Sequence, residues 1–189
     1  DMLYEFDELS ICRMMDDFQV HHVVGQWKGV TASGRDAPHL SPQYHLHLSE
    51  GEGKAHVVVE VRQPSHRDIG GNVYQGIKAF VARNADRHAN VYLEPRLDSS
   101  AFVCSRSAVI EIDCPRTNSP ISISPVTWDS NYESVFYVDI YTDCKSQLIA
   151  CDDRDVPRDP VSGEILKGAI ISYKEDDGRQ VFLLKKNQK

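Results

Sequence analysis

The sequence predicts an all-β fold, an antiparallel β-sandwich of about eight strands, over residues 19–143. Short apolar runs with a period of two recur along this stretch, and such alternation is typical of strands that bury one face. Clusters rich in glycine, proline, serine and aspartate separate the runs, and these residue types favour turns. Amphipathic helical segments, which a parallel sheet needs as crossovers, do not lie between the runs, so an antiparallel arrangement follows.

The clearest strand covers residues 43–48, where apolar and polar residues alternate. Its even-numbered residues should face the core, so His45 and His47 should face solvent on the other side. Further apolar and β-branched runs predict strands at residues 57–61, 72–82, 108–112 and 135–141. The turn clusters between the strands cover residues 33–38, 51–53, 68–71 and 115–120.

The N-terminal segment, residues 1–18, departs from this pattern. Its apolar residues lie among acidic neighbours without one clear period, which predicts a short helix that runs into an extended segment. The sequence begins at Asp1 and shows no signal peptide, so we expect a piece of a longer protein.

The C-terminal part, residues 144–189, differs from the sandwich in composition and in its pattern of apolar residues. A charged, proline-bearing stretch at 152–160 predicts a solvated loop. Two apolar runs, 164–173 and 179–184, then flank an Asp-Gly turn at 175–178, which predicts a hairpin-like extension. This extension could add strands to the sandwich or begin another module, and the sequence leaves both alternatives open.

Composition excludes several classes of function. The net charge of −7 argues against a nucleic-acid partner, because phosphate binding depends on an excess of Lys and Arg. No apolar run approaches the roughly 20 residues that a membrane-spanning helix needs. The cysteines are odd in number and widely spaced, which suits reduced thiols of an intracellular, cytoplasmic protein. They are Cys12, Cys104, Cys114, Cys144 and Cys151.

Two groups of residues raise the question of a metal site. His45 and His47 share one side of a strand and, with the pair His21-His22, could bind zinc, but solvent-facing histidines are the stronger interpretation. Calcium could bind where aspartates from several predicted loops gather, but ordinary solvated turns are again the stronger interpretation. These aspartates are Asp36, Asp68, Asp98 and Asp129. We therefore expect no metal site.

The sequence contains no catalytic constellation. It has no Gly-x-Ser-x-Gly motif, and the glycine pair at 51–53 encloses a glutamate that would repel a phosphate. No cysteine lies in a context that would activate it, and we expect Cys104 and Cys114 to be small buried hydrophobes. Three aromatic residues could form a ligand platform, but core positions are the stronger interpretation for Trp27, Trp128 and Phe136.

Five stretches, read in order, resemble the calpain family of cysteine peptidases. Residues 4–12 are similar to the phenylalanine-then-leucine-x-isoleucine-cysteine segment that closes the calpain protease core. Residues 25–34 are similar to the start of the family's β-sandwich, usually called domain III, although Ser33 replaces the first of two glycines. The residues that match in this second stretch are Trp27, Gly29, Thr31, Ala32 and Gly34.

The later stretches resemble further strands of the same domain. Residues 41–48 match its asparagine-proline-glutamine-aromatic strand, residues 69–74 its isoleucine-glycine…tyrosine strand, and residues 120–138 its closing pair. The matching residues are Pro42, Gln43, Tyr44, Gly70, Tyr74, Pro125, Thr127 and Phe136. The positions that depart from the family's residues are Ser41, Val126 and Ser134.

The resemblance implies a non-catalytic regulatory sandwich at 19–143, after the end of a protease core or a linker at 1–18 and before an unassigned extension at 144–189. Calpain catalysis uses a Cys, a His and an Asn upstream of this point. The parent would be a calcium-dependent cysteine endopeptidase or a catalytically inactive homologue. The implied partners are the protease core and downstream domains of the same parent chain, and a phospholipid membrane surface.

The resemblance also implies a response to calcium through a long acidic loop after the strand at 43–48. Here that loop is only residues 49–54, and it keeps Glu50 and Glu52. Electrostatic switching through it should be much weaker, so we expect no cofactor, with calcium left open. A free-standing β-sandwich module that binds calcium and phospholipid, or another protein, is the alternative function.

Overall fold

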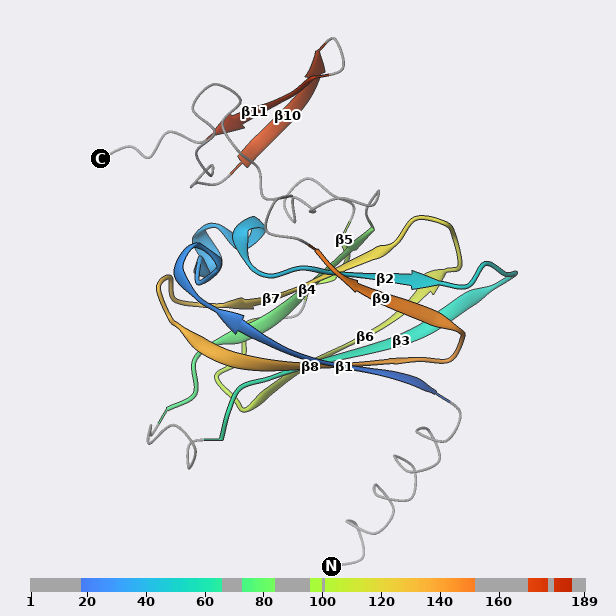
Figure 1. Cartoon of the computed structure of the whole chain (residues 1–189), viewed down its shortest axis with the longest axis horizontal. Coiled ribbons are helices and arrows are strands. Elements are labelled where there is room, and N and C mark those ends of the chain that lie inside the picture. Colours follow the sequence, from blue (N-terminus) through green and yellow to red (C-terminus); the bar gives the residue numbers. More distant parts are fainter. Residues whose placement is uncertain are drawn as a thin grey trace, which may run out of the picture.

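Two antiparallel β-sheets packed around one core form the sandwich in the computed structural model of the chain (Figure 1). The structure describes residues 18–65, 73–83, 96–99, 101–151, 170–176 and 179–184. All strand pairs within these ranges are antiparallel, which confirms the predicted all-β sandwich. None of the described residues belongs to a helix long and apolar enough to cross a membrane. The expectations for residues 1–17 and 152–160 lie outside the described residues.

The first sheet has four strands in the order β1-β8-β3-β6. These strands are β1 (Gln19–Trp27), β8 (Ser134–Thr142), β3 (Lys54–Arg62) and β6 (Ser107–Pro115). Buried and accessible residues alternate along β3 and β6, as expected for strands that have one face on a core. The inward face of this sheet is therefore apolar, while its outward face carries the accessible alternates, both polar and apolar.

The second sheet has five strands in the order β5-β4-β7-β2-β9. These strands are β5 (Arg96–Ser99), β4 (Ile77–Arg83), β7 (Ile121–Thr127), β2 (Tyr44–Leu48) and β9 (Ser146–Ala150). Strand β9 pairs with β2, so the sandwich continues past the predicted domain boundary at residue 143.

Strand β4 begins later than the sequence indicated. A strand was expected over 72–82, but the ladder starts only at Ile77. The carbonyl of Gln75 accepts a hydrogen bond from the Gln63 side-chain amide, and the carbonyl of Gly76 accepts one from the backbone N–H of Trp128. The Gln75 carbonyl is therefore satisfied by a side chain instead of a strand neighbour, whereas the bond between Gly76 and Trp128 continues the β4–β7 register by one residue.

The core is formed by apolar side chains from the inward faces of both sheets. Its largest fully buried apolar side chains are Trp27, Phe136, Leu46, Ile77, Ile121, Ile123 and Ile140. The core positions expected for Trp27 and Phe136 are thereby confirmed, whereas Trp128 is 42% exposed. Trp128 follows the last residue of β7 and so lies beyond the inward-facing positions of that strand.

Two further expectations about burial are wrong. His45 is 6% exposed rather than solvent-facing, because β2 lies inside the five-stranded sheet between β7 and β9. Its cross-strand neighbour Ser122 is also buried, so the outward face of this sheet is shielded there. Cys104 is exposed, in contrast to Cys114, because it lies in the connection before β6 rather than on an inward strand position.

The C-terminal hairpin is confirmed. Strand β10 (Ile170–Asp176) pairs antiparallel with β11 (Arg179–Leu184), and the register places Asp176 opposite Arg179 around the predicted turn. Among the described strands, these two pair only with each other. The expected strand at 164–173 is described from Ile170 onward.

Replacement of Trp27 by alanine should lower the free energy of unfolding by about 3–5 kcal/mol, because it removes a fully buried indole from the core. Urea unfolding followed by circular dichroism measures this loss. Trp128→Ala is the matched control and should cost clearly less, since that indole is half-exposed. Equal losses in the two variants would contradict the assignment of Trp27 to the core.

Candidate functional site

The residues that carry the family resemblance gather mainly at one end of the sandwich. We call this region the loop end, and it comprises the connection 28–43 and the turn 128–133. The connection contains three short 3-10 helices, η1 (Gly29–Thr31), η2 (Gly34–Asp36) and η3 (Pro38–Leu40). Strand β1 ends at this region in Trp27, and β7 ends there in Thr127.

The indole of Trp27 connects the two sheets beneath the loop end. Its Nε1–H donates a hydrogen bond to the carbonyl oxygen of Pro125 at 3.0 Å, and both groups are buried. Trp27 belongs to the four-stranded sheet and Pro125 to the five-stranded sheet. The indole ring also lies 4.7 Å from the ring of Phe136, between centroids. One side chain thus fills the core and satisfies a buried carbonyl of the opposite sheet.

Tyr44 extends this aromatic group into the five-stranded sheet. Its ring meets that of Phe136 edge-on, with centroids 6.4 Å apart. Burial, and to a smaller extent the neighbouring Cys151 thiol, raises the pKa of Tyr44 to about 12. The phenol is therefore neutral at physiological pH and acts as a packing group rather than as an acid or base.

Pro42 and Gln43 brace the start of β2. The Ser124 hydroxyl donates to the Pro42 carbonyl at 3.3 Å, and the Cys151 backbone N–H donates to the Gln43 carbonyl at 2.9 Å. Gln43 itself is only 2% exposed. These two motif residues therefore tie β2 to its neighbours within the sheet.

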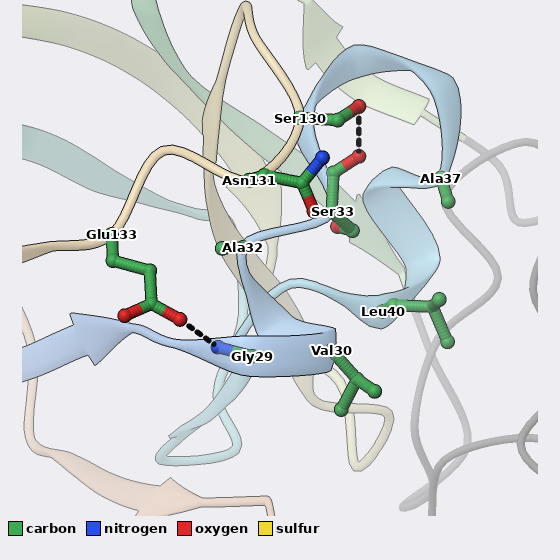
Figure 2. A pocket seen from close by; sticks show the side chains of 9 residues that line it. All are labelled: Gly29, Val30, Ala32, Ser33, Ala37, Leu40, Ser130, Asn131 and Glu133. Atoms are coloured by element: carbon green, nitrogen blue, oxygen red, sulfur yellow. Dashed lines mark hydrogen bonds between the residues drawn. The ribbon is translucent and has the colours of Figure 1, made fainter.

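Hydrogen bonds join the connection and the turn into one unit. The backbone N–H of Asn131 donates to the Ala32 carbonyl at 2.7 Å, and the Ser130 hydroxyl donates to the Ser33 carbonyl at 2.9 Å. Figure 2 shows Ser130 and Ser33 side by side across the two segments. Asn131 has φ of 64°, a left-handed conformation that asparagine tolerates well.

Motif threonines and glycines fix the local turns of this unit. The Thr31 hydroxyl donates to the Lys28 carbonyl at 2.9 Å and closes η1. The Thr127 hydroxyl donates to the Asp129 carbonyl, also at 2.9 Å, and shapes the turn after β7. The Gly29 backbone N–H donates to the Glu133 carboxylate at 2.8 Å.

Gly34 occupies a position that only glycine fits. Its φ is +65°, and a Cβ there would lie 2.5 Å from the backbone nitrogen of Ser130 and 2.7 Å from the carbonyl carbon of Asp129. Backbone atoms cannot move aside as a flexible side chain could. The close approach of the connection to the turn therefore depends on Gly34.

Two departures from the family's residues contact each other. The hydroxyl of Ser33, at the position of a family glycine, lies 3.1 Å from the hydroxyl of Ser41, at the position of a family asparagine. Ser41 is fully buried, so the contact satisfies a hydroxyl that would otherwise lack solvent. The changes at 33 and 41 therefore fit one another.

A pocket of about 430 Å³ opens at the loop end (Figure 2). Its walls combine apolar side chains with hydroxyl, amide and carboxylate groups, contributed by Gly29, Val30, Ala32, Ser33, Ala37, Leu40, Ser130, Asn131 and Glu133. Two motif residues, Gly29 and Ala32, belong to this lining. The pocket could not be predicted, because its other walls come from loop residues without a recognisable pattern.

The remaining predicted positions lie elsewhere. Gly70 is outside the described residues, and Tyr74 is half-buried just before β4. Glu50 and Glu52 are exposed in the short loop after β2. Arg116 holds that loop, because its guanidinium donates to the Ser49 carbonyl at 2.9 Å and to the Glu50 backbone carbonyl at 3.3 Å. Its conformation therefore rests on backbone groups.

Metal candidates do not come together in the described part of the chain. No group of three or more His, Cys, Asp or Glu side chains suitable for an ion is found there. Asp68 lies outside that part, and Asp98 is in strand β5 rather than in the expected loop.

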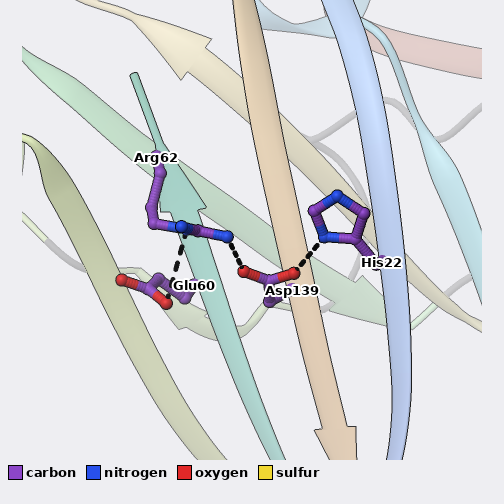
Figure 3. Close-up of polar contacts among 4 residues, drawn as sticks. All are labelled: His22, Glu60, Arg62 and Asp139. Atoms are coloured by element: carbon purple, nitrogen blue, oxygen red, sulfur yellow. Dashed lines mark hydrogen bonds and ion pairs between the residues drawn. The ribbon is translucent and has the colours of Figure 1, made fainter. Parts of the chain in front are cut away.

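The histidine pair at 21 and 22 has structural partners instead. On the outward face of the four-stranded sheet, His22 Nδ1 lies 2.5 Å from an Asp139 carboxylate oxygen, and Arg62 pairs with the other oxygen (Figure 3). Arg62 Nε also lies 3.7 Å from Glu60. On the inward side, His21 Nε2 lies 2.8 Å from the Ser146 hydroxyl, and burial lowers its pKa.

Two of the described cysteines are suited to packing. Burial raises the pKa of Cys114 and of Cys144 above the ordinary value of a thiol. Because the thiolate is the reactive form, these two groups are poor nucleophiles near neutral pH.

Gly34→Ala should lower the free energy of unfolding by at least about 2 kcal/mol, since it adds backbone overlap to left-handed strain. Gly29→Ala is the matched control, because Gly29 also has positive φ but its Cβ would meet nothing within 4 Å. It should cost only about 1 kcal/mol. Urea unfolding of both variants checks the difference, and a larger loss at Gly29 would contradict this account of the loop end.

Comparison with known proteins finds similarity to a calpain-type protease. No protein-family model matches the chain. The chain is 24% identical over 168 residues to the calpain-type cysteine protease ADL1 of Oryza sativa subsp. japonica, which covers 79% of this chain. The chain spans only 8% of the length of that relative. The similarity supports a calpain-related origin for this β-sandwich.

Proposed function

We propose that the chain is a non-catalytic regulatory or scaffolding domain of a calpain-like cysteine peptidase, corresponding to the family's domain III. The observation that carries this proposal is the loop end. Motif residues from three separate stretches, including Trp27, Pro42 and Thr127, act there as structural groups that hold one another in place. The similarity to a calpain-type protease of rice supports the same interpretation.

The chemistry of the thiols supports a non-catalytic role. A peptidase nucleophile needs a lowered thiol pKa, whereas the pKa values of Cys114 and Cys144 are raised by burial. In this proposal the parent is a calcium-dependent cysteine endopeptidase or an inactive homologue, acting in the cytoplasm. The sandwich would hold the protease core of that parent against its downstream domains.

The isolated chain should show no thiol-dependent cleavage of casein under reducing conditions, with or without calcium. An active calpain-type protease in the same assay serves as the positive control. Cleavage that is abolished by a cysteine alkylator would contradict the proposed non-catalytic role.

A surface at one end of β4 favours a second candidate function, binding to phospholipid. Trp128 is half-exposed, and its ring lies 5.0 Å from that of Phe102 and 4.0 Å below the guanidinium carbon of Arg35. Lys78 Nζ also lies 4.9 Å from the Phe102 ring, but Lys78 is only 8% exposed, so Arg35 is the accessible cation of this surface. Aromatic rings beside cations suit the boundary between acyl chains and anionic headgroups. Binding would depend on this surface alone, because the net charge of −7 of the whole chain repels anionic lipid.

If that surface binds membranes, the chain should pellet with phosphatidylserine-containing vesicles and not with phosphatidylcholine vesicles. Trp128→Ala should remove most of the pelleting, because the exposed indole supplies the apolar contact. Ile149→Ala alters an equally exposed apolar residue on β9 and should leave it unchanged. Absence of pelleting by the unsubstituted chain, with and without calcium, would exclude the second candidate.

A further inference from the structure

Four strands lie at the edges of the two sheets, and they differ in how their free backbone groups are protected. Strands β5 and β9 are short, with four and five residues. Strand β6 has nine residues, but it carries Glu111 and Asp113 on its outward face and ends in Pro115. Short length, charge and proline are the usual means by which an edge is kept from pairing with another strand.

Strand β1 has none of these protections. It is nine residues long and contains no Lys, Arg, Asp, Glu or Pro. Its pairing with β8 runs without a bulge from Gln19 to Trp27, and among the described strands β8 is its only neighbour. Two of its outward residues, Val20 and Val24, are 47% and 58% exposed. A long, regular and apolar edge of this kind favours addition of a further strand.

The outward face of β1 and β8, beside this edge, presents apolar side chains and charges that are already paired. Val20 lies opposite Tyr141 and Val24 opposite Tyr137, so two largely apolar pairs flank the pair of His22 and Asp139. The Asp139 carboxylate is satisfied by His22 and Arg62 within the same face (Figure 3). An added strand would therefore meet apolar groups and paired charges rather than an unpaired ion.

We propose that β1 pairs antiparallel with β1 of a second copy of this chain, which joins two four-stranded sheets into one. Val20 and Val24 are equally spaced about His22. A two-fold axis at His22 therefore places Val20 of each copy opposite Val24 of the other, on the same face. The strand carries no Lys, Arg, Asp or Glu, and each of the two His22 rings that meet at the axis is paired with Asp139 of its own copy. This self-complementary pattern favours a second copy over an unrelated strand.

The experiment is sedimentation equilibrium of the full chain over micromolar to submillimolar concentrations. The expected mass is twice the 21.3 kDa of one chain. Val24→Lys should weaken dimerisation by about tenfold or more, because both symmetric valine pairs lose an apolar partner. Two control variants, Ile149→Lys on β9 and Val109→Lys on β6, place the same charge at exposed positions on two other edge strands. Both should leave the dimer intact.

Circular dichroism shows whether each variant remains folded, and lysine at these exposed positions is not expected to unfold the chain. A monomer at every concentration would overturn the proposal, as would a dimer that Ile149→Lys disrupts and Val24→Lys does not. If the edge instead binds a strand of another protein, this chain alone should remain a monomer in the same experiment. The proposed regulatory role is independent of this outcome, because the mass measurement does not test proteolysis.

Discussion

The hydrogen bond from the Trp27 indole to the Pro125 carbonyl is the contact on which the loop end depends. It joins a strand of one sheet to a strand of the other, in a region that excludes water. The indole also packs on Phe136, which in turn meets Tyr44 from the opposite sheet. This contact also positions the connection with the 3-10 helices, because the connection begins directly after Trp27. Gly34 then allows the connection to approach the turn after β7.

Much of the fold could be predicted because strand alternation is a local property. The hairpin at Asp176 and the inward positions of β3 are examples. Burial on the outward faces could not be predicted, since it depends on which strands become neighbours. His45 is buried for that reason, and Trp128 is exposed because it lies just beyond a strand end. The pocket was equally inaccessible to prediction, as its walls come from loops without periodicity.

The arrangement of the loop end explains what the motif residues do in the structure. Gly34, Thr31 and Thr127 form the turns of the loop end, while Trp27 anchors it to the core. Where the chain departs from the family's residues, Ser33 and Ser41 contact each other through their hydroxyls. Such a network provides rigidity, which is what the proposed scaffolding role requires. The similarity to a much longer calpain-type protease is consistent with that role.

Exchange of the Trp27 indole N–H with deuterated water, followed by NMR, tests the central role of this contact most directly. The indole of Trp128, which is half-exposed, provides an internal comparison in the same sample. If Trp27 anchors the loop end, its indole hydrogen should exchange as slowly as core amides such as that of Val59, through global unfolding alone. Exchange as fast as that of Trp128 would show that the loop end opens independently and would contradict the account.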